Sequence, residues 1–269
     1  MKNVYGSRVL VTGATSGIGR ACARAFAARG CDVTGVSRSA REGTEAFRGG
    51  GKLTLLPLDV TDEAAVRETV RDRGPFDIAV LCAGMGVAGP LEELPMAETR
   101  RQMEVNYFGT LQVIQALLPG MRKNGKGLIL VIGSIAGRVS IPMQSQYSAS
   151  KYALEAAVDA LRMELAPYGV RAVILEPGDT KTGFTAARAS TVAEDSVYRG
   201  TFEKSIARMA RDEQNGKSPS TVAKTALALA GRKNPPARVP VGAEYKALMV
   251  LLRFLPDRVR EAIVTKMYL

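Results

Sequence analysis

Two side chains four residues apart could carry out acid/base chemistry. Tyr147 and Lys151 lie in a segment with helical periodicity, and this spacing puts both on one face of a helix. A free tyrosine titrates near pH ~10, too high for efficient proton transfer at neutral pH. We therefore expect the ammonium of Lys151 to lower the pKa of Tyr147. A Tyr/Lys pair alone is more typical of an exposed helix face. The other motifs of the sequence must therefore distinguish a catalytic pair from an exposed one.

A serine completes a possible reaction centre. Ser134 directly follows the apolar run 128–133, and the carboxyl end of a buried strand is where α/β sheets place reactive groups. Its hydroxyl could hold a carbonyl oxygen beside Tyr147, although a serine here could also only cap a loop. The sequence has no histidine, which excludes a Ser-His-Asp hydrolase, a His-ligated zinc site and a histidine base.

A glycine-rich turn could hold a dinucleotide. Gly13, Gly17 and Gly19 follow the first apolar segment and open a helical one. Glycines permit a tight turn and close backbone approach, and a helix N-terminus offers N–H groups to a pyrophosphate. A strand-to-helix turn without a ligand is the alternative. The second strand ends at Ser37 and Arg38 without the acid that would bind the ribose of NAD, so the sequence favours NADP(H) over NAD(H).

Alternating segments must position these residues. Strand-like runs cover residues 8–12, 32–37, 53–58, 77–81, 127–133 and 171–176, with a further candidate at 238–241. Helical patterns cover 17–29, 62–73, 96–123 (in one or two pieces), 145–168 and 221–230. Repeated β-α alternation with continuous apolar strands predicts a parallel sheet covered on both faces. The fold class is therefore α/β, a Rossmann-type doubly wound sheet in one domain, residues 1–269.

Two later segments depart from this alternation. Residues 179–215 are rich in Thr, Ala, Ser and charge, and we expect a partly helical substrate flap there. Residues 244–269 predict a C-terminal helical segment broken at Pro256. Leu251 and Phe254 beside Arg253 suit a helix at a membrane surface, but a helix packed on the core with a basic outer face is favoured.

The motifs occur together in one order. The glycine turn, Asn106, Ser134, Tyr147-x-x-x-Lys151 and Pro177-Gly178 resemble the short-chain dehydrogenase/reductase family, particularly its hydroxysteroid and retinol dehydrogenase-like members. The resemblance covers roughly residues 7–182. Where that family often has Asn-Asn-Ala-Gly, this chain has Leu81-Cys82-Ala83-Gly84, which puts a sheet-bracing hydrogen bond in doubt. Cys82 is then expected to be a small buried hydrophobe.

The resemblance implies roles for particular residues. Asn106, Ser134, Tyr147 and Lys151 would be the catalytic set, with Asn106 holding a water that links Lys151 to solvent. Asp59 would contact the adenine, unless it caps the next helix, and Thr182, with Thr180, would contact the carboxamide. The predicted cofactor residues are Gly13, Thr15, Ser16, Gly17, Ile18, Gly19, Ser37, Arg38, Asp59, Val60, Ala83, Gly84, Tyr147, Lys151, Pro177, Gly178, Thr180 and Thr182.

The expected activity is NADP(H)-dependent interconversion of a ketone or aldehyde with an alcohol. Ile141 and Met143 lie between Ser134 and Tyr147 and suggest a bulky apolar ketone or alcohol as substrate. The flap and the C-terminal helical segment resemble family members that act on steroids, retinoids and other lipids, and this resemblance implies a substrate such as a hydroxysteroid or retinoid. The other pocket candidates are Gly86, Gln144, Phe184 and Tyr198. A catalytically idle NADP(H)-binding regulator or redox sensor is the alternative.

Composition limits the setting and the partners. The three cysteines have no metal-ligand spacing, so we expect no metal and a reducing, cytoplasmic location. The net charge of +11 is scattered rather than gathered in a basic block, which argues against a nucleic-acid partner. Apolar residues on more than one face of helices 96–123 and 145–168 predict a homodimer or homotetramer. No uncharged run is long enough to span a membrane.

Overall fold

The central element is an eight-stranded sheet. The computed structural model describes residues 3–269, and its strands run in the order β10-β8-β7-β5-β1-β2-β4-β3. Neighbouring strands are parallel except β3, which pairs antiparallel with β4 at the edge. The strands are β1 (Arg8–Thr12), β2 (Asp32–Ser37), β3 (Gly43–Ala46), β4 (Lys52–Pro57), β5 (Ile78–Leu81), β7 (Gly127–Ile132), β8 (Val170–Pro177) and β10 (Arg238–Val241). The predicted parallel α/β sheet is confirmed.

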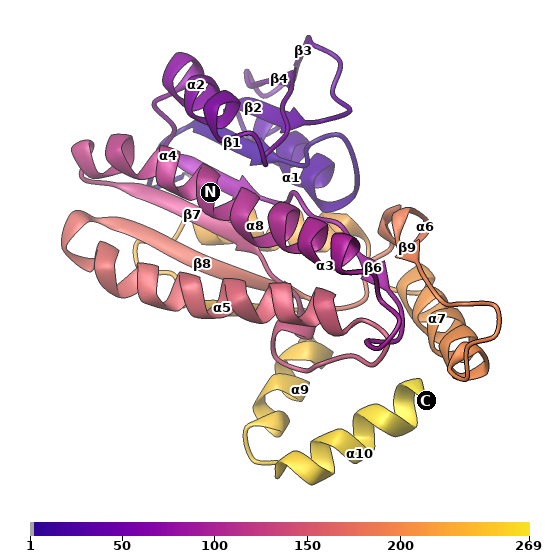
Figure 1. Cartoon of the computed structure of the whole chain (residues 1–269). Coiled ribbons are helices and arrows are strands. Elements are labelled where there is room, and N and C mark those ends of the chain that lie inside the picture. Colours follow the sequence, from indigo (N-terminus) through magenta and orange to yellow (C-terminus); the bar gives the residue numbers. More distant parts are fainter. Residues whose placement is uncertain (1–2) are drawn as a thin grey trace.

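Helices cover both faces of the sheet (Figure 1). On one face lie α1 (Gly17–Ala27) and α8 (Pro219–Ala230), which bury Phe26 and Val222 in one core. On the other lie α2 (Glu63–Arg73), α4 (Gly109–Lys123) and α5 (Ser145–Leu165), which bury Val66, Val113 and Leu154 in a second core. Every residue of β7 is buried because both of its faces are covered, so its sequence is apolar throughout rather than alternating.

The strand order determines where the candidate active site lies on the sheet. From β1 the chain proceeds to β2 and β4 on one side of the sheet, then returns to β5, β7 and β8 on the other. In open α/β sheets, ligands bind outside the carboxyl ends of the strands at this reversal. Gly13, Ser134 and Pro177 lie at or just beyond strand ends, and α5 brings Tyr147 and Lys151 to the same edge.

The predicted helix over residues 96–123 is interrupted. It consists of α3 (Met96–Met103), a π-helical turn (Glu104–Phe108) and α4. Such turns are frequent at functional sites, and this one contains the buried Asn106. Strand β3 was not predicted, because all four of its residues are exposed and no buried face leaves an apolar pattern.

The flap and the C-terminal segment are helical and lie at one end of the molecule (Figure 1). The flap contains α6 (Phe184–Ala187) and α7 (Arg199–Gln214), and its short strand β9 (Ala189–Ser190) pairs with β6 (Val87–Ala88). The C-terminal helices are α9 (Ala243–Leu252) and α10 (Asp257–Tyr268), and α10 contacts α7. Between residues 3 and 269, no helix combines the length and apolar character that crossing a membrane requires.

Candidate active site

A cavity of about 960 Å³ opens at the carboxyl ends of the strands. Ser134, Tyr147 and Lys151 line it, as does every residue predicted above to bind the dinucleotide. Asn106 is the one member of the predicted set that does not line this cavity. The structure therefore brings the proposed reaction centre and the proposed cofactor site into one space.

The glycine turn forms a cradle that side chains would fill. Gly13 has a φ of +65°, and a Cβ there would lie 3.1 Å from the carbonyl oxygen of Cys82. A Cβ on Gly19 would overlap the carbonyl of Gly13. The N-cap of α1, Ser16, makes no side-chain cap hydrogen bond, and the first turn contains no acid. These features fit a pyrophosphate held by backbone N–H groups at the helix N-terminus.

The sequence put in doubt a hydrogen bond that braces the sheet beyond β5. In the structure, a side chain at the end of β1 provides such a contact. The hydroxyl oxygen of Thr12 accepts hydrogen bonds from the backbone N–H groups of Cys82 and Ala83, each at 3.0 Å. The ends of β1 and β5 are therefore joined without asparagine side chains. Cys82 has a pKa well above its ordinary value, mainly through a hydrogen bond with Cys22 and through burial, so it is a poor nucleophile.

Three hydroxyls gather at the end of β2. The hydroxyl of Thr15 lies 3.0 Å from that of Ser37 and 3.1 Å from that of Ser39. Arg38 is exposed on the rim of the cavity beside them. Glu42, the nearest following acid, instead faces Arg73, with 3.8 Å between the charged atoms. This cluster, including Ser39, which the sequence analysis did not single out, suits a phosphate better than a ribose diol.

Asp59 does not cap the following helix. Its carboxylate accepts hydrogen bonds from the backbone N–H and the hydroxyl of Thr61, at 3.0 and 2.8 Å. The N-cap of α2 is Asp62, which accepts from the N–H of Ala65 at 3.0 Å. The capping alternative for Asp59 is therefore wrong. Its side chain is fixed by Thr61 at the cavity wall, next to Val60.

Ser134, Tyr147 and Lys151 are held by short-range contacts. The hydroxyl of Ser134 accepts from the N–H of Ala136 at 3.0 Å and caps a 3₁₀ turn. Lys151 is buried, and its Nζ donates to the carbonyl of Ile132 at 2.9 Å. The same Nζ lies 5.7 Å from the centroid of the Tyr147 ring. The hydroxyl and the ammonium thus flank the tyrosine at the end of β7.

The pKa of Tyr147 is raised, whereas the sequence analysis expected Lys151 to lower it. Burial raises it above its ordinary value, and the Ser134 hydroxyl lowers it by less. Burial also lowers the pKa of Lys151 to about 8. The expected net lowering of the Tyr147 pKa is not found because desolvation of the phenolate is the largest influence. Tyr147 is therefore held as a proton donor.

Asn106 contacts the backbone around the site rather than Lys151. Its amide accepts from the N–H of Met85 at 2.8 Å and donates to the Met85 carbonyl and the Ser150 hydroxyl, both at 3.0 Å. Ser150 in turn donates to the carbonyl of Tyr147 at 2.7 Å. This chain of hydrogen bonds fixes the first turn of α5, while the water-holding role implied by the resemblance stays a prediction.

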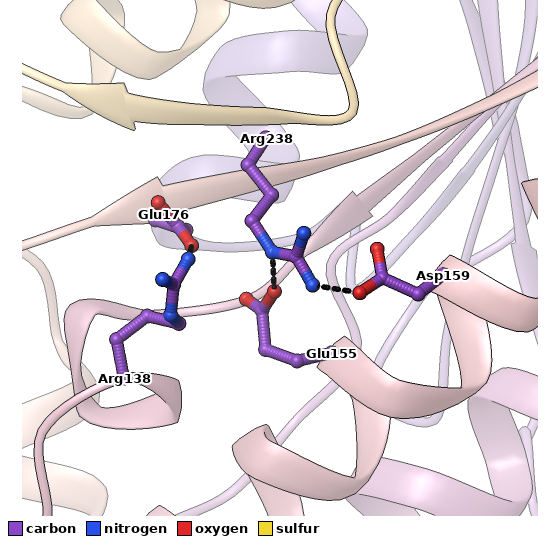
Figure 2. Close-up of polar contacts among 5 residues, drawn as sticks. All are labelled: Arg138, Glu155, Asp159, Glu176 and Arg238. Carbon is purple, nitrogen blue, oxygen red and sulfur yellow. Dashed lines mark hydrogen bonds and ion pairs between the residues drawn. The ribbon is translucent and has the colours of Figure 1, made fainter. Parts of the chain in front are cut away.

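A network of charges lies behind the reaction centre (Figure 2). Arg238 of β10 pairs with Glu155 and Asp159 on α5, and Arg138 pairs with Glu176 at 3.2 Å. Glu176 directly precedes Pro177, and Arg138 follows the turn that Ser134 caps. Burial and the neighbouring Glu176 raise the pKa of Glu155 to about 7, against the effect of Arg238. The Arg138–Glu176 pair joins the Ser134 turn to the end of β8, and the pairs of Arg238 join β10 to α5.

The other end of the cavity is built largely from the flap and the C-terminal helices. The ring of Phe184 lies 5.6 Å, centroid to centroid, from that of Tyr147. Ile141 and Gln144 also line the cavity, as predicted. The lining residues that the sequence analysis missed are Asp179, Met209, Glu213, Tyr245 and Tyr268. They lie in the predicted flap and in the predicted C-terminal segment, but no motif within these segments singles out individual residues.

Three other pocket candidates do not line this cavity. Gly86 packs beneath Phe184, whose ring a Cβ there would contact at 2.8 Å. The carbonyl of Met143 accepts from the N–H of Gly89, and Met143 has a φ of +61°. Tyr198 donates to Glu92 at 2.6 Å on the surface. They shape or support the flap instead.

Residues 7–193 match the short chain dehydrogenase family. The chain belongs to that family. This short-chain dehydrogenase is 35% identical over 260 residues to a 3-ketodihydrosphingosine reductase from Bacteroides thetaiotaomicron, with 94% of each chain covered. It is also 35% identical over 271 residues to an NADPH-dependent 3-dehydrocapnine reductase from Ornithobacterium rhinotracheale, with 96% and 95% covered.

The fold agrees with the same assignment. A solved short-chain dehydrogenase from Streptomyces avermitilis superimposes with a TM-score of 0.78 at 27% identity, covering 98% of this chain and 97% of the other. Members of the family bind a nicotinamide cofactor and interconvert alcohols and carbonyl compounds. This short-chain dehydrogenase is accordingly an oxidoreductase that acts on CH–OH or C=O groups.

Proposed function

We propose that this chain is an NADPH-dependent reductase of a ketone carried by a long-chain lipid. The observation that carries the proposal is the meeting of Ser134, Tyr147 and Lys151 in one cavity with the glycine cradle. The reaction class follows from family membership, and the substrate class follows from the apolar residues at the far end, such as Phe184 and Met209.

The residues of this chain divide the reaction between them. Bound nicotinamide supplies the hydride that a carbonyl carbon accepts. The hydroxyls of Ser134 and Tyr147 donate hydrogen bonds to the carbonyl oxygen and stabilise the negative charge that develops there. Tyr147 then transfers its proton to that oxygen, and the ammonium of Lys151 stabilises the phenolate that remains. The ring of Phe184 packs beside that of Tyr147.

Preference for the phosphorylated dinucleotide rests on the end of β2. A 2′-phosphate carries nearly two negative charges, and Arg38 with the hydroxyls of Ser37 and Ser39 supplies complementary donors. Glu42, which could otherwise accept from a ribose diol, is turned toward Arg73. The NADPH-dependent relative supports the same choice.

The names of the relatives support a narrower substrate than the sequence suggested. The substrates in both names, 3-ketodihydrosphingosine and 3-dehydrocapnine, are long-chain amino ketones. The cavity offers apolar lining for an alkyl chain and polar groups near the reacting carbonyl. Neither of these two names contains a steroid or a retinoid, so a linear lipid ketone replaces the hydroxysteroid or retinoid in our proposal.

The test is NADPH oxidation by the purified chain with 3-ketodihydrosphingosine, a ketosteroid, retinal and a small ketone as substrates. We expect turnover with the linear lipid ketone to exceed that with the others. Equal or greater turnover with the steroid or retinal would contradict the substrate class. Tight NADPH binding without turnover of any carbonyl would instead favour the idle regulator or redox sensor.

The proposal includes a homodimer or homotetramer. The outer face of α5 exposes Tyr152 and Met163, which are 42% and 73% accessible. A second copy packed on this face would bury both side chains. Light scattering at micromolar concentration tests this, and a monomer there would contradict it.

A further inference from the structure

The substrate end of the cavity carries an excess of negative charge. Asp179 and Glu213 both line it, and Asp212 lies close enough to raise the pKa of Asp179. Glu213 is neutralised by the buried Arg188 and also accepts from Thr185. Asp212 is neutralised by Arg208, with 2.7 Å between the charged atoms. Within residues 3–269, Asp179 forms no ion pair, so its charge is uncompensated.

Asp179 is fixed in place even though it has no basic partner. The hydroxyl of Tyr245 donates to one carboxylate oxygen of Asp179 at 2.8 Å and accepts from its backbone N–H at 2.8 Å. The ring of Tyr245 packs so closely on Gly178 that a Cβ at that glycine would overlap it. The carbonyl of Asp179 accepts from the N–H of Lys217 at 3.0 Å. The second carboxylate oxygen remains available at the cavity wall.

The nearby basic side chains are engaged elsewhere. Lys217, whose backbone holds Asp179, directs its ammonium to Glu244 at 2.7 Å. Burial is the first cause of the raised pKa of Asp179, and the acids at 212 and 213 add to it. A partly buried carboxylate without a cation costs free energy, which a ligand of positive charge would offset. Such an arrangement at a substrate cavity points to binding rather than to stability.

A short chain of contacts joins Glu213 to the proton donor, because its partner Arg188 lies 5.9 Å from the centroid of the Phe184 ring, which lies 5.6 Å from that of Tyr147. Glu213 raises the pKa of both Tyr147 and Asp179, so its charge acts on the proton donor and on the unpaired acid alike. Tyr268 from α10 also lines the cavity and has its pKa raised to about 12 by burial and by Asp179. A cationic group on the substrate near the carbonyl would therefore meet Asp179.

We infer that Asp179 is a specificity-determining residue that binds a protonated amine close to the ketone of the substrate. The inference rests on the proposed function and narrows it to amino ketones. The ammonium would donate to the free oxygen of Asp179, while Tyr245 holds the other oxygen and fixes the direction of the carboxylate. The positive charge of Arg188 is offset by its ion pair with Glu213, so Arg188 does not repel the ammonium strongly.

The experiment compares three ketones of equal chain length: the 2-amino-3-ketone, its N-acetyl derivative and the ketone without nitrogen. The wild-type chain should reduce the amino ketone with a kcat/KM about 10–150-fold above that of the two uncharged ketones, the range expected for one charge-assisted hydrogen bond. In Asp179→Asn, the ratio between the amino ketone and the nitrogen-free ketone should fall by about the same factor. Asparagine can still accept from Tyr245, so the substitution removes the charge and retains the contact.

A matched control separates this charge from acidity in general. Glu261→Gln removes an exposed acid of α10 that does not line the cavity and forms no ion pair within residues 3–269, and the substrate ratio should stay within about twofold of the wild-type ratio. Equal kcat/KM values of the wild-type chain for the charged and uncharged ketones would overturn the inference and leave the proposed function intact. Failure of all three ketones to oxidise NADPH would instead overturn the proposed function. Because the wild-type comparison needs no variant, the test stands even where Asp179→Asn fails to fold.

Discussion

The two ends of the cavity are built by different means. The cofactor end is made by backbone: the glycine turn, the ends of consecutive strands and the first turn of α1. The substrate end is made by side chains from α6, α7, α9 and α10, segments up to nearly half of the chain away from the reaction centre in sequence. A backbone cradle tolerates few residue types, whereas a side-chain wall can be rebuilt one residue at a time. The comparison shows why a shared cofactor end can serve different substrates.

The two ends also differ in how they are fixed. Thr12 joins β1 to β5 at the cofactor end, and the network of Arg138, Glu176, Arg238 and Glu155 stiffens the reaction centre from behind. The flap depends on the short β6–β9 pair and on the Arg188–Glu213 contact. Substitutions at the two ends should therefore separate cleanly into effects on NADPH and effects on substrate.

The largest effect is expected where the two ends meet. Tyr147→Phe removes the proton donor and should lower kcat by about 10²–10⁴-fold, the usual contribution of acid/base catalysis. NADPH affinity, measured by fluorescence titration, should change little because the phenyl ring remains. A mutant with more than about one-tenth of the wild-type kcat would contradict the role assigned to the hydroxyl.

The next effect tests the cofactor end alone. Arg38→Ala should weaken NADPH binding about 10–150-fold and leave NADH nearly unchanged, because a charge-assisted hydrogen bond to the 2′-phosphate is worth about 1.5–3 kcal/mol. Arg41→Ala is the control, since Arg41 is exposed nearby but does not line the cavity. An unchanged NADPH-to-NADH ratio of kcat/KM in Arg38→Ala would assign the phosphate to another residue.

The reduction should also depend on pH through Lys151. Burial lowers the pKa of this lysine to about 8, so the ammonium that stabilises the phenolate is present below that pH and is lost above it. We expect kcat/KM for reduction to fall by up to about tenfold per unit as the pH rises beyond ~8. The raised pKa of Tyr147 keeps the donor protonated over the same range. A rate that stays constant to pH ~10 would contradict this dependence on Lys151.

The smallest effect is expected at the substrate end. Phe184→Leu removes the aromatic contact with Tyr147 but keeps an apolar wall, and should lower kcat/KM by about 2–10-fold, since such pairs contribute about 0.5–1.5 kcal/mol. NADPH affinity should be unaffected. A larger loss of NADPH affinity than of substrate kcat/KM would break the proposed division between the two ends.

Local chemistry made the cofactor end predictable. The strands and the glycine turn follow from apolar runs and from the conformations that only glycine adopts easily, and Tyr147 and Lys151 share a helix face by spacing alone. The π-helical turn at Asn106 and the exposed strand β3 were not predicted, because neither leaves an apolar pattern. The direction of the Tyr147 pKa was also missed, since burial depends on the segments that cover the ring.

The sequence by itself determined the family, the sheet and the positions of Ser134, Tyr147 and Lys151, because these depend on periodicity and on short spacings. Only the tertiary structure decided which side chains face the substrate. The predicted Tyr198 and Met143 do not line the cavity, whereas Tyr245, Tyr268 and other residues of distant helices do. It also left Asp179 unpaired while pairing its acidic neighbours. Ion pairing depends on distances between segments far apart in the chain, and those distances exist only once the helices have packed.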